Sequence, residues 1–283
     1  AHPEAGWTEF RTAALIIRRL RELGYAIRMG EAACASDRRM GVPSSAVLAA
    51  ARERALEHGA DAELVAGMGD GYTGFWADLD CGPGPVTAFR FDMDCNEVAE
   101  CAEESHRPVR EGFASRWPGL MHACGHDGHA AVGLGLAEVL VSIRRHLRGR
   151  IRLIFQPAEE GARGALPMSE AGAVDGVDVL FGFHIGFKAE GPGSLICGTQ
   201  GFLATTKRDV LFSGVPAHAG AAPEEGKDAL LAACSAVVNL HAISRNGKGG
   251  TRIAVGRLEG GEARNVIPAS ARLFMETRGE TTE

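Results

Sequence analysis

The sequence predicts an α/β protein with a mostly parallel sheet covered by helices, followed by a smaller α+β unit. Short apolar runs separated by helical patterns predict the sheet, because strands that alternate with helices tend to pair in parallel. After Gly198 the order becomes strand, helix, strand, strand, which fits the first two-thirds of a ferredoxin-like β-α-β-β-α-β unit. Since 283 residues exceed the usual size of one domain, we expect two domains, 1–198 and 199–283.

The first third of the chain predicts two helices and a short strand. Apolar residues recur at helical spacing in 8–23, and Gly24 is a natural helix stop. A strand is expected at 25–29. The segment 44–58 begins with serines, which favour helix N-termini, and the glycines within 67–74 indicate a flexible loop.

Four further strands are expected in the first domain. Two of them, 75–79 and 86–93, are joined by the turn 80–85. The other two, 151–155 and 177–183, are continuous apolar runs, which are typical of strands buried on both faces.

Composition excludes several classes of protein. Hydrophobic content of 45% and a charged fraction of 23% are those of an ordinary globular protein. A net charge of −6 argues against nucleic acid as a partner, and the absence of a long apolar run argues against the membrane. The seven cysteines are odd in number and form no C-x-x-C pair, which indicates reduced thiols in the cytoplasm.

Three of the predicted strands end in groups that can bind or support a metal. Asp92 and Asp94 end the second strand, Glu159 and Glu160 follow 151–155, and His184 follows 177–183. Ligands of parallel sheets bind outside the carboxyl ends of the strands, so we expect these groups to converge at one rim.

The stretch 121–129 packs a thiol, three imidazoles and a carboxylate into nine residues. Cys and His are ligands for zinc-like ions, although a Gly-rich loop with a buried Cys and solvated histidines would look the same. Convergence with the three strand ends favours the metal site. A helix at 130–147 follows, with an apolar stripe made of Val132, Leu136, Val139, Leu140 and Ile143.

The adjacent carboxylates Glu159 and Glu160 suggest a division of labour. One can ligate a metal while the other takes a proton from an activated water. The alternative is a solvated charge pair at the start of a helix, where acidic residues suit the helix dipole.

At these residues the chain resembles the amidohydrolase branch of the M20 metallopeptidases. The resemblance lies in 121–129, 156–161, 182–184 and 217–220, and the runs 89–98, 105–108 and 264–268 narrow it further. It implies a zinc-peptidase-like catalytic domain with an inserted ferredoxin-like domain that acts as a lid and mediates dimers. The branch includes hydrolases of indole-acetyl amino acids, N-acyl amino acids and aminobenzoyl-glutamate.

The resemblance also implies roles for individual residues in the hydrolysis of a small amide by two divalent ions, Mn²⁺ or Zn²⁺. The general base would be Glu159. Many family members carry a histidine ligand at the strand end occupied here by Asp92 and Asp94, so these two are expected to orient ligands instead, and His129 to serve the helix start. The implied metal ligands are Cys124, His126, Glu160 and His184.

In the second domain the resemblance assigns His218 to the oxyanion of a neighbouring subunit's active site, in a homodimer or a heteromer with a homologous subunit. Without the resemblance, the favoured interpretation of His218 is a loop histidine beside Gly220. Asn265 matches a residue that contacts substrate, and Arg264 or Lys207 could pair with a substrate carboxylate.

The family returns from the lid to the catalytic sheet and there supplies one more metal-binding histidine. We therefore expect this chain to be part of a longer enzyme, and a chain ending at Glu283 to have little activity and a weakened second metal site. Two other readings stay open. One is a cysteine hydrolase with Cys124 as nucleophile and His126 as base, which leaves the carboxylate pair unused. The other is an inactive family member that binds ligands or oligomerises.

Overall fold

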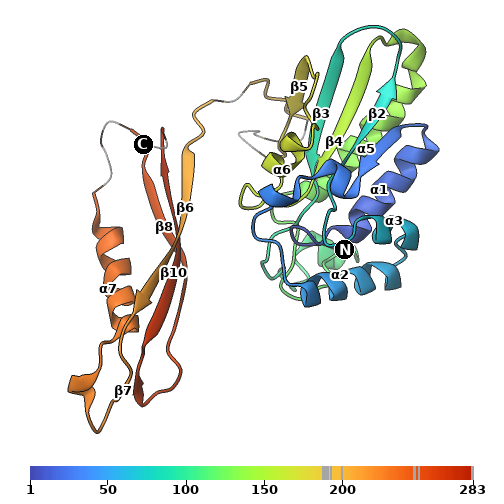
Figure 1. Ribbon diagram of the computed structural model, residues 1–283. Coiled ribbons are helices and arrows are strands. Elements are labelled where there is room, and N and C mark those ends of the chain that lie inside the picture. Colours follow the sequence, from blue (N-terminus) through green and yellow to red (C-terminus); the bar gives the residue numbers. More distant parts are fainter. Residues whose placement is uncertain (187–190, 192, 199, 245–246, 248, 282–283) are drawn as a thin grey trace. The chain divides into compact units, whose positions relative to one another are not determined.

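The computed structural model describes the chain except for residues 187–190, 192, 199, 245–246, 248 and 282–283. It divides into two compact units, Ala1–Lys188 and Ala189–Glu283, which are treated separately below (Figure 1). The sequence places the domain boundary ten residues later, at 198/199. Assignment of the units as catalytic domain and lid stays a prediction.

The first unit is built on a five-stranded sheet with the strand order β1-β2-β4-β3-β5. Strands β3, β4 and β5 are parallel, whereas β1 pairs with β2 and β2 with β4 in antiparallel fashion. The strands are β1 (Ala26–Met29), β2 (Phe75–Asp80), β3 (Val86–Asp92), β4 (Arg150–Gln156) and β5 (Val179–Gly182).

The prediction of a mostly parallel sheet is therefore wrong, and the sheet is mixed. The reason lies in the short connection 81–85 between β2 and β3. A parallel crossover needs a dozen or more residues, so this turn reverses the chain, and β4 then inserts between the two strands. The three strands that carry the candidate ligands are nevertheless parallel to one another.

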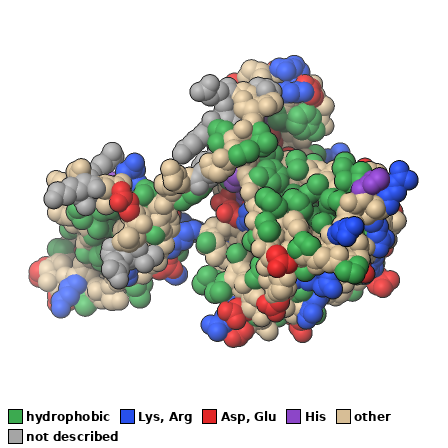
Figure 2. All heavy atoms as spheres, turned by 90° about the horizontal axis from the view of Figure 1, so that it is seen from above, with side chains coloured by type: hydrophobic (Ala, Val, Ile, Leu, Met, Phe, Trp, Pro, Cys, Tyr) green, Lys and Arg blue, Asp and Glu red, His purple; other side chains and the backbone are tan. Residues whose placement is uncertain are grey.

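Strand β5 also departs from expectation. The sequence predicts a strand buried on both faces, but Val179, Leu180 and Phe181 are each about half exposed, at 47%, 50% and 53%. Strand β5 lies at the edge of the sheet, where β3 is its one neighbour among the described strands. Hydrophobic side chains accordingly reach the surface of this unit, coloured green in Figure 2.

Helices cover the sheet and form the main core with it (Figure 1). Helix α2 begins at a side-chain cap, since Ser44 accepts a hydrogen bond from the Val47 N–H. Helix α3, which sequence reasoning missed, is capped by Asp61 in the same way. The helices are α1 (Phe10–Glu22), α2 (Ser45–Glu57), α3 (Ala62–Gly67), α4 (Arg107–Arg110), α5 (His126–Ser142) and α6 (Ala165–Glu170), with 3-10 helices η1 (Gly30–Ala33), η2 (Ser36–Arg38) and η3 (Arg144–His146).

Helix α5 begins four residues earlier than predicted, at His126, and buries a different face. The expected stripe is largely exposed, including Val132 at 47% and Val139 at 55%. Small residues decide this orientation, because Gly133 lets the helix approach the rings of Phe91 and Phe155 in the sheet. The buried residues are His126, His129, Ala130, Gly133, Ala137 and Leu140.

The second unit has the predicted order of strand, helix, strand, strand. Its main sheet is antiparallel with the order β6-β10-β8, and α7 packs Ala229 and Ala233 against Ala271 and Leu273 of β10. Strands β7 and β9 form a separate two-stranded sheet. The elements are β6 (Ala204–Ser213), β7 (Ala217–His218), η4 (Pro223–Glu225), α7 (Ala229–Ala242), β8 (Arg252–Gly260), β9 (Val266–Ile267) and β10 (Ser270–Gly279).

Within the described part of the chain, each helix is too short or too polar to span a bilayer.

Substitution of two glycines of α5 by alanine is expected to change the stability in opposite directions. A Cβ on Gly133 would lie 2.8 Å from Phe155 Cζ and 3.0 Å from Phe91 Cδ2, and both rings are buried. We therefore expect Gly133→Ala to lower the free energy of unfolding by ~1–3 kcal/mol through overpacking. The matched control is Gly135→Ala, where no heavy atom lies within 4 Å, and it should gain up to ~1 kcal/mol of helix propensity. Urea denaturation measures both, and equal stability of the two variants would contradict this packing.

Candidate metal centre

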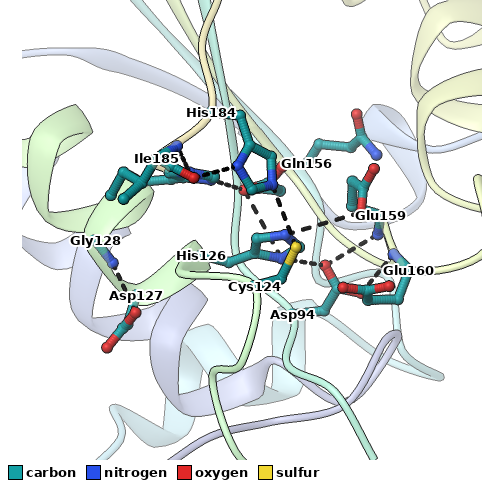
Figure 3. A network of polar contacts seen from close by, with 12 residues as sticks. Asp94, Cys124, His126, Asp127, Gly128, Gln156, Glu159, Glu160, His184 and Ile185 are labelled. Carbon is teal, nitrogen blue, oxygen red and sulfur yellow. Dashed lines mark hydrogen bonds and ion pairs between the residues drawn. The ribbon is translucent and has the colours of Figure 1, made fainter. Parts of the chain in front are cut away.

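Candidate ligands that follow two of the parallel strands, and others at the start of one helix, meet at the carboxyl end of those strands (Figure 3). Helix α5 begins with His126, and Cys124 lies just before it. The chain beyond β4 contributes Glu159 and Glu160, and the chain beyond β5 contributes His184. The structure thus brings together the four predicted ligands and the predicted base.

The donor atoms are close enough to share cations. Cys124 Sγ lies 3.2 Å from His184 Nε2, and His126 Nε2 lies 3.8 Å from Glu159 Oε2. Within each of three overlapping groups, the donor atoms lie within 4.8 Å of one another. All three groups contain His126: the first adds Cys124 and His184, the second Glu159 and Glu160, and the third Asp92 and His129.

The hydrogen bonds of His126 test whether a cation fits. Its Nδ1 lies 3.3 Å from Asp94 Oδ1, and because a carboxylate only accepts, Nδ1 donates and Nε2 of the neutral ring keeps a lone pair. Nε2 is buried and has no hydrogen-bond partner among the described residues. A buried nitrogen without a partner is costly, and a cation at this place would satisfy it.

His184 is oriented in the same sense. Its Nδ1 lies 2.8 Å from the carbonyl oxygen of Ile185 and donates to it, so Nε2 keeps the lone pair and faces Cys124 Sγ. Imidazole nitrogens, a thiol and carboxylates together are the donor set of zinc-like divalent ions, and a second hydrogen bond on the far ring nitrogen is usual for metal-binding histidines. The residues present therefore fit a divalent cation.

Asp94 supports both sides of the site. Its Oδ1 accepts the backbone N–H of Glu159 and its Oδ2 that of Glu160, each at 3.0 Å. Together with the bond from His126, one buried carboxylate fixes an imidazole and two carboxylate-bearing residues.

Asp92 acts through His129 instead. His129 Nδ1 makes a short hydrogen bond to Asp92, and His129 Nε2 accepts the N–H of Ile185 at 2.9 Å. Both ring nitrogens are occupied, so His129 links β3 to the residue after His184 and has no nitrogen left for a metal. Burial opposes the charge of Asp92, but the bond to His129 and the nearby Arg90 outweigh it and lower the pKa of Asp92.

Glu9 is a neighbour of the site that sequence reasoning missed. It precedes α1, and its Oε1 accepts the N–H of Ala158 at 2.8 Å while its Oε2 accepts the hydroxyl of Thr73 at 2.6 Å. Three consecutive N–H groups, 158–160, are thus held by buried carboxylates. An acidic residue before a helix is common, so the sequence carried no signal for this contact.

The predicted alternative of a helix start at Glu159 does not occur, since α6 begins at Ala165.

The crowding of acids shifts the titration of the site. Burial, followed by the charge of Glu160, raises the pKa of Glu159 and raises that of Cys124 to about 11. Burial opposes the imidazolium of His126, but its bond to Asp94 and the surrounding carboxylates raise its pKa on balance. A thiol with this pKa is protonated near neutral pH, and a bound cation is what would release its proton.

The second unit holds the other predicted residues. His218 is exposed, and its Nδ1 accepts the N–H groups of Gly220 and Ala221 at 3.2 and 3.1 Å, which leaves the proton of the neutral ring on Nε2. The carbonyl oxygen of Asn265 accepts the N–H of Ala219 at 3.0 Å. Arg264 and Lys207 are exposed.

The family model described as Peptidase family M20/M25/M40 matches residues 88–260. The chain belongs to this family. It is 50% identical over 283 residues to the indole-3-acetyl-aspartic acid hydrolase of Enterobacter agglomerans, covering 100% of this chain and 65% of that protein. It is also 50% identical over 279 residues to one of the subunits of p-aminobenzoyl-glutamate hydrolase from Escherichia coli K12, covering 98% and 64%. The runs 89–98, 105–108 and 264–268 resemble the A subunit of aminobenzoyl-glutamate hydrolase in particular, and the match to the Escherichia coli protein supports that resemblance.

Solved structures agree. The aminobenzoyl-glutamate utilization protein of Klebsiella pneumoniae superimposes with a TM-score of 0.77 at 45% identity, covering 99% of this chain and 64% of that one. The YXEP protein of Bacillus subtilis, described as a dinuclear metal-binding peptidase of the M20 family, gives 0.55 at 28% identity, covering 99% and 61%. The chain spans less than two thirds of the length of each of these relatives.

The buried Glu9 predicts a pH-dependent stability. Burial, then the charge of Asp94, raises its pKa to about 8 from the model-compound value of 4.5. Between these values the unfolded chain has lost a proton that the folded chain keeps, so stability falls as pH rises through this window, by up to ~5 kcal/mol. Glu9→Gln has no such proton, and it can still accept from Ala158. Melting temperatures measured from about pH 5 to 8.5 should fall less for the variant. Equal slopes for variant and parent would contradict the shifted pKa.

Proposed function

We propose that this chain is the metal-binding part of an amidohydrolase that cleaves the amide bond of an N-acyl or aminobenzoyl amino acid, with aminobenzoyl-glutamate as the leading substrate. The observation that carries the proposal is the convergence of a thiol, two imidazoles and two carboxylates around His126 Nε2, which has no hydrogen-bond partner among the described residues. The names of the relatives support the amide bond and the acidic amino acid.

In this proposal two divalent ions, Mn²⁺ or Zn²⁺, are held by Cys124, His126, Glu160 and His184. Such ions supply the Lewis acidity that polarises an amide carbonyl and lowers the pKa of water. The chain itself fixes the ligands, since the far ring nitrogens of both histidines are engaged by Asp94 and by the Ile185 carbonyl.

Glu159 is proposed as the general base. Its side chain is 36% exposed, so it borders both the ligands and the space open to substrate. Its raised pKa brings the carboxylate closer to the neutral range in which a general base works best. It would take the proton of the attacking water and pass it to the leaving amine.

His218 suits the role of oxyanion donor. Because its Nδ1 accepts two backbone N–H groups, the neutral ring presents an Nε2–H donor without needing protonation. We propose that His218 serves the site of a second subunit, identical or homologous, through the lid domain. The Escherichia coli relative is named as one subunit of its hydrolase, which supports a partner chain. Arg264 or Lys207 would pair with a carboxylate of the substrate, and Asn265 would contact the substrate.

Other substrates are the runner-up: N-acyl or indole-acetyl amino acids, the latter supported by the name of the Enterobacter relative. An inactive family member that binds or oligomerises is the remaining alternative. The geometry disfavours a cysteine hydrolase, because the pKa of Cys124 is raised to about 11 and its sulfur contacts His184 rather than the predicted base, His126. The seven free thiols support a reducing compartment such as the cytoplasm.

Glu159→Gln tests the base. Made in full-length protein, it should lower turnover of p-aminobenzoyl-glutamate by ~10²–10⁴-fold, because the proton acceptor is lost while the ligands stay in place. Elemental analysis should find the metal content unchanged. The matched control, Glu160→Gln, should lose metal as well as turnover. Turnover retained by Glu159→Gln would rule out its role as base.

Metal stoichiometry tests the centre itself. After loading with Mn²⁺ or Zn²⁺, we expect bound ions that chelators remove. Cys124→Ala should abolish this binding, because Cys124 belongs to one ligand group with His126 and His184 and also interacts with Glu160 of another. Close to two ions per chain supports a dinuclear site, and one ion supports a site that needs a further ligand. Metal content unaffected by Cys124→Ala would contradict the proposed ligand set.

A further inference from the structure

The amide of Asn96 spans two of the candidate ligands. Asn96 lies four residues beyond the end of β3, and its Nδ2 donates to Glu160 Oε1 at 2.6 Å. Its Oδ1 accepts the backbone N–H of Cys124 at 3.0 Å. Both ends of one neutral side chain are therefore used, one on the carboxylate of Glu160 and one on the backbone of the Cys124 loop.

Backbone hydrogen bonds fix the position of Asn96 itself. Its N–H donates to the carbonyl oxygen of Met121 at 3.0 Å and its own carbonyl accepts from Met121 at 3.1 Å, which forms an antiparallel bridge to the loop before Cys124. On its other side, the N–H of Cys95 donates to the carbonyl oxygen of Glu4 at 2.8 Å. A donor on Cys124 and an acceptor on Glu160 also leave one consistent orientation of the amide oxygen and nitrogen.

We propose that Asn96 is a positioning residue of the metal centre. It engages one oxygen of the Glu160 carboxylate and sets the distance between that carboxylate and the Cys124 backbone, so that ligands from β4 and from the 121–129 loop arrive in register. The inference rests on the proposed function. Asp94 fixes the backbone of Glu160, and Asn96 fixes its side chain.

A neutral donor suits this place for an electrostatic reason. Four carboxylates already surround His126 and the Asn96 amide: Asp92, Asp94, Glu159 and Glu160. An amide can hold a Glu160 oxygen without neutralising the carboxylate that a cation needs. Hydrogen bonds of this kind to ligating residues commonly change metal affinity by ~10–100-fold.

Asn96→Asp isolates the contact with Glu160. The aspartate has nearly the same shape and can still accept the N–H of Cys124, but it replaces the donor to Glu160 with a repelling oxygen. We expect the affinity for Zn²⁺, measured by chelator competition on this chain, to fall ~10–100-fold. The matched control is Asn239→Asp on α7, where an exposed asparagine donates to the Ser235 carbonyl at 2.8 Å, and it should bind Zn²⁺ as the parent does.

Cobalt gives a readout that a merely structural role would not move. Co²⁺ bound through Cys124 should show a thiolate-to-metal charge-transfer band, and Asn96→Asp should shift or weaken it while the melting temperature stays near that of Asn239→Asp. Asn96→Ala adds no charge and should lose Zn²⁺ affinity by a comparable factor, which guards against a folding defect of the aspartate variant.

The outcomes separate the two proposals. A parent chain that binds no Zn²⁺ or Co²⁺ would overturn the proposed function and this inference with it. A parent chain that binds both, beside Asn96 variants with equal or tighter affinity and an unchanged cobalt spectrum, would overturn the inference alone.

Discussion

The candidate site depends first on the carboxylate of Asp94. It is fully buried, and it accepts hydrogen bonds from the N–H groups of Glu159 and Glu160 and from the imidazole of His126. Without it, one buried donor and two partly buried donors would lose their acceptor at once, and a buried donor left unsatisfied costs about 1–3 kcal/mol. The same bonds turn His126 Nε2 towards the centre and place the glutamate pair opposite it. Other contacts refine this frame, with Glu9 on Ala158 and Asn96 on the Glu160 side chain.

The carboxylates that support the site also repel one another. Carboxylates that fix backbone and imidazoles also repel the carboxylates that face the centre, and the raised pKa values of Glu159 and Cys124 express that repulsion together with burial. A divalent cation would relieve both effects, because it favours the ionised forms of a thiol and a carboxylate. The folded protein therefore holds a preorganised cluster of acidic groups. The repulsion within this cluster destabilises the folded state when no cation is bound.

The sequence predicted the part of this arrangement that follows from local pattern. Apolar runs marked β3, β4 and β5, and the polar residues after them converge because parallel strands share one rim. The prediction failed where contacts between residues far apart in the sequence determine the structure. The exposed stripe of α5 looked apolar enough to be buried, but Gly133 sets which face approaches the sheet. Glu9 meets Ala158 from 149 positions away, and no local pattern encodes that meeting.

Hydrogen bonds separate the histidines more sharply than spacing does. In the sequence, His126, His129 and His184 all offer an imidazole near the expected site, and it is the family resemblance that assigns His129 to the helix start. In the structure, His126 and His184 each commit Nδ1 to an acceptor and turn Nε2 to the centre, whereas His129 commits both nitrogens, to Asp92 and to the N–H of Ile185. His218 commits Nδ1 as an acceptor and keeps a proton on Nε2, which makes it a donor to anions rather than a ligand of cations. The hydrogen bonds of each ring, which no motif specifies, therefore decide which of the proposed roles it suits: metal ligand, support for a ligand, or donor to an anion.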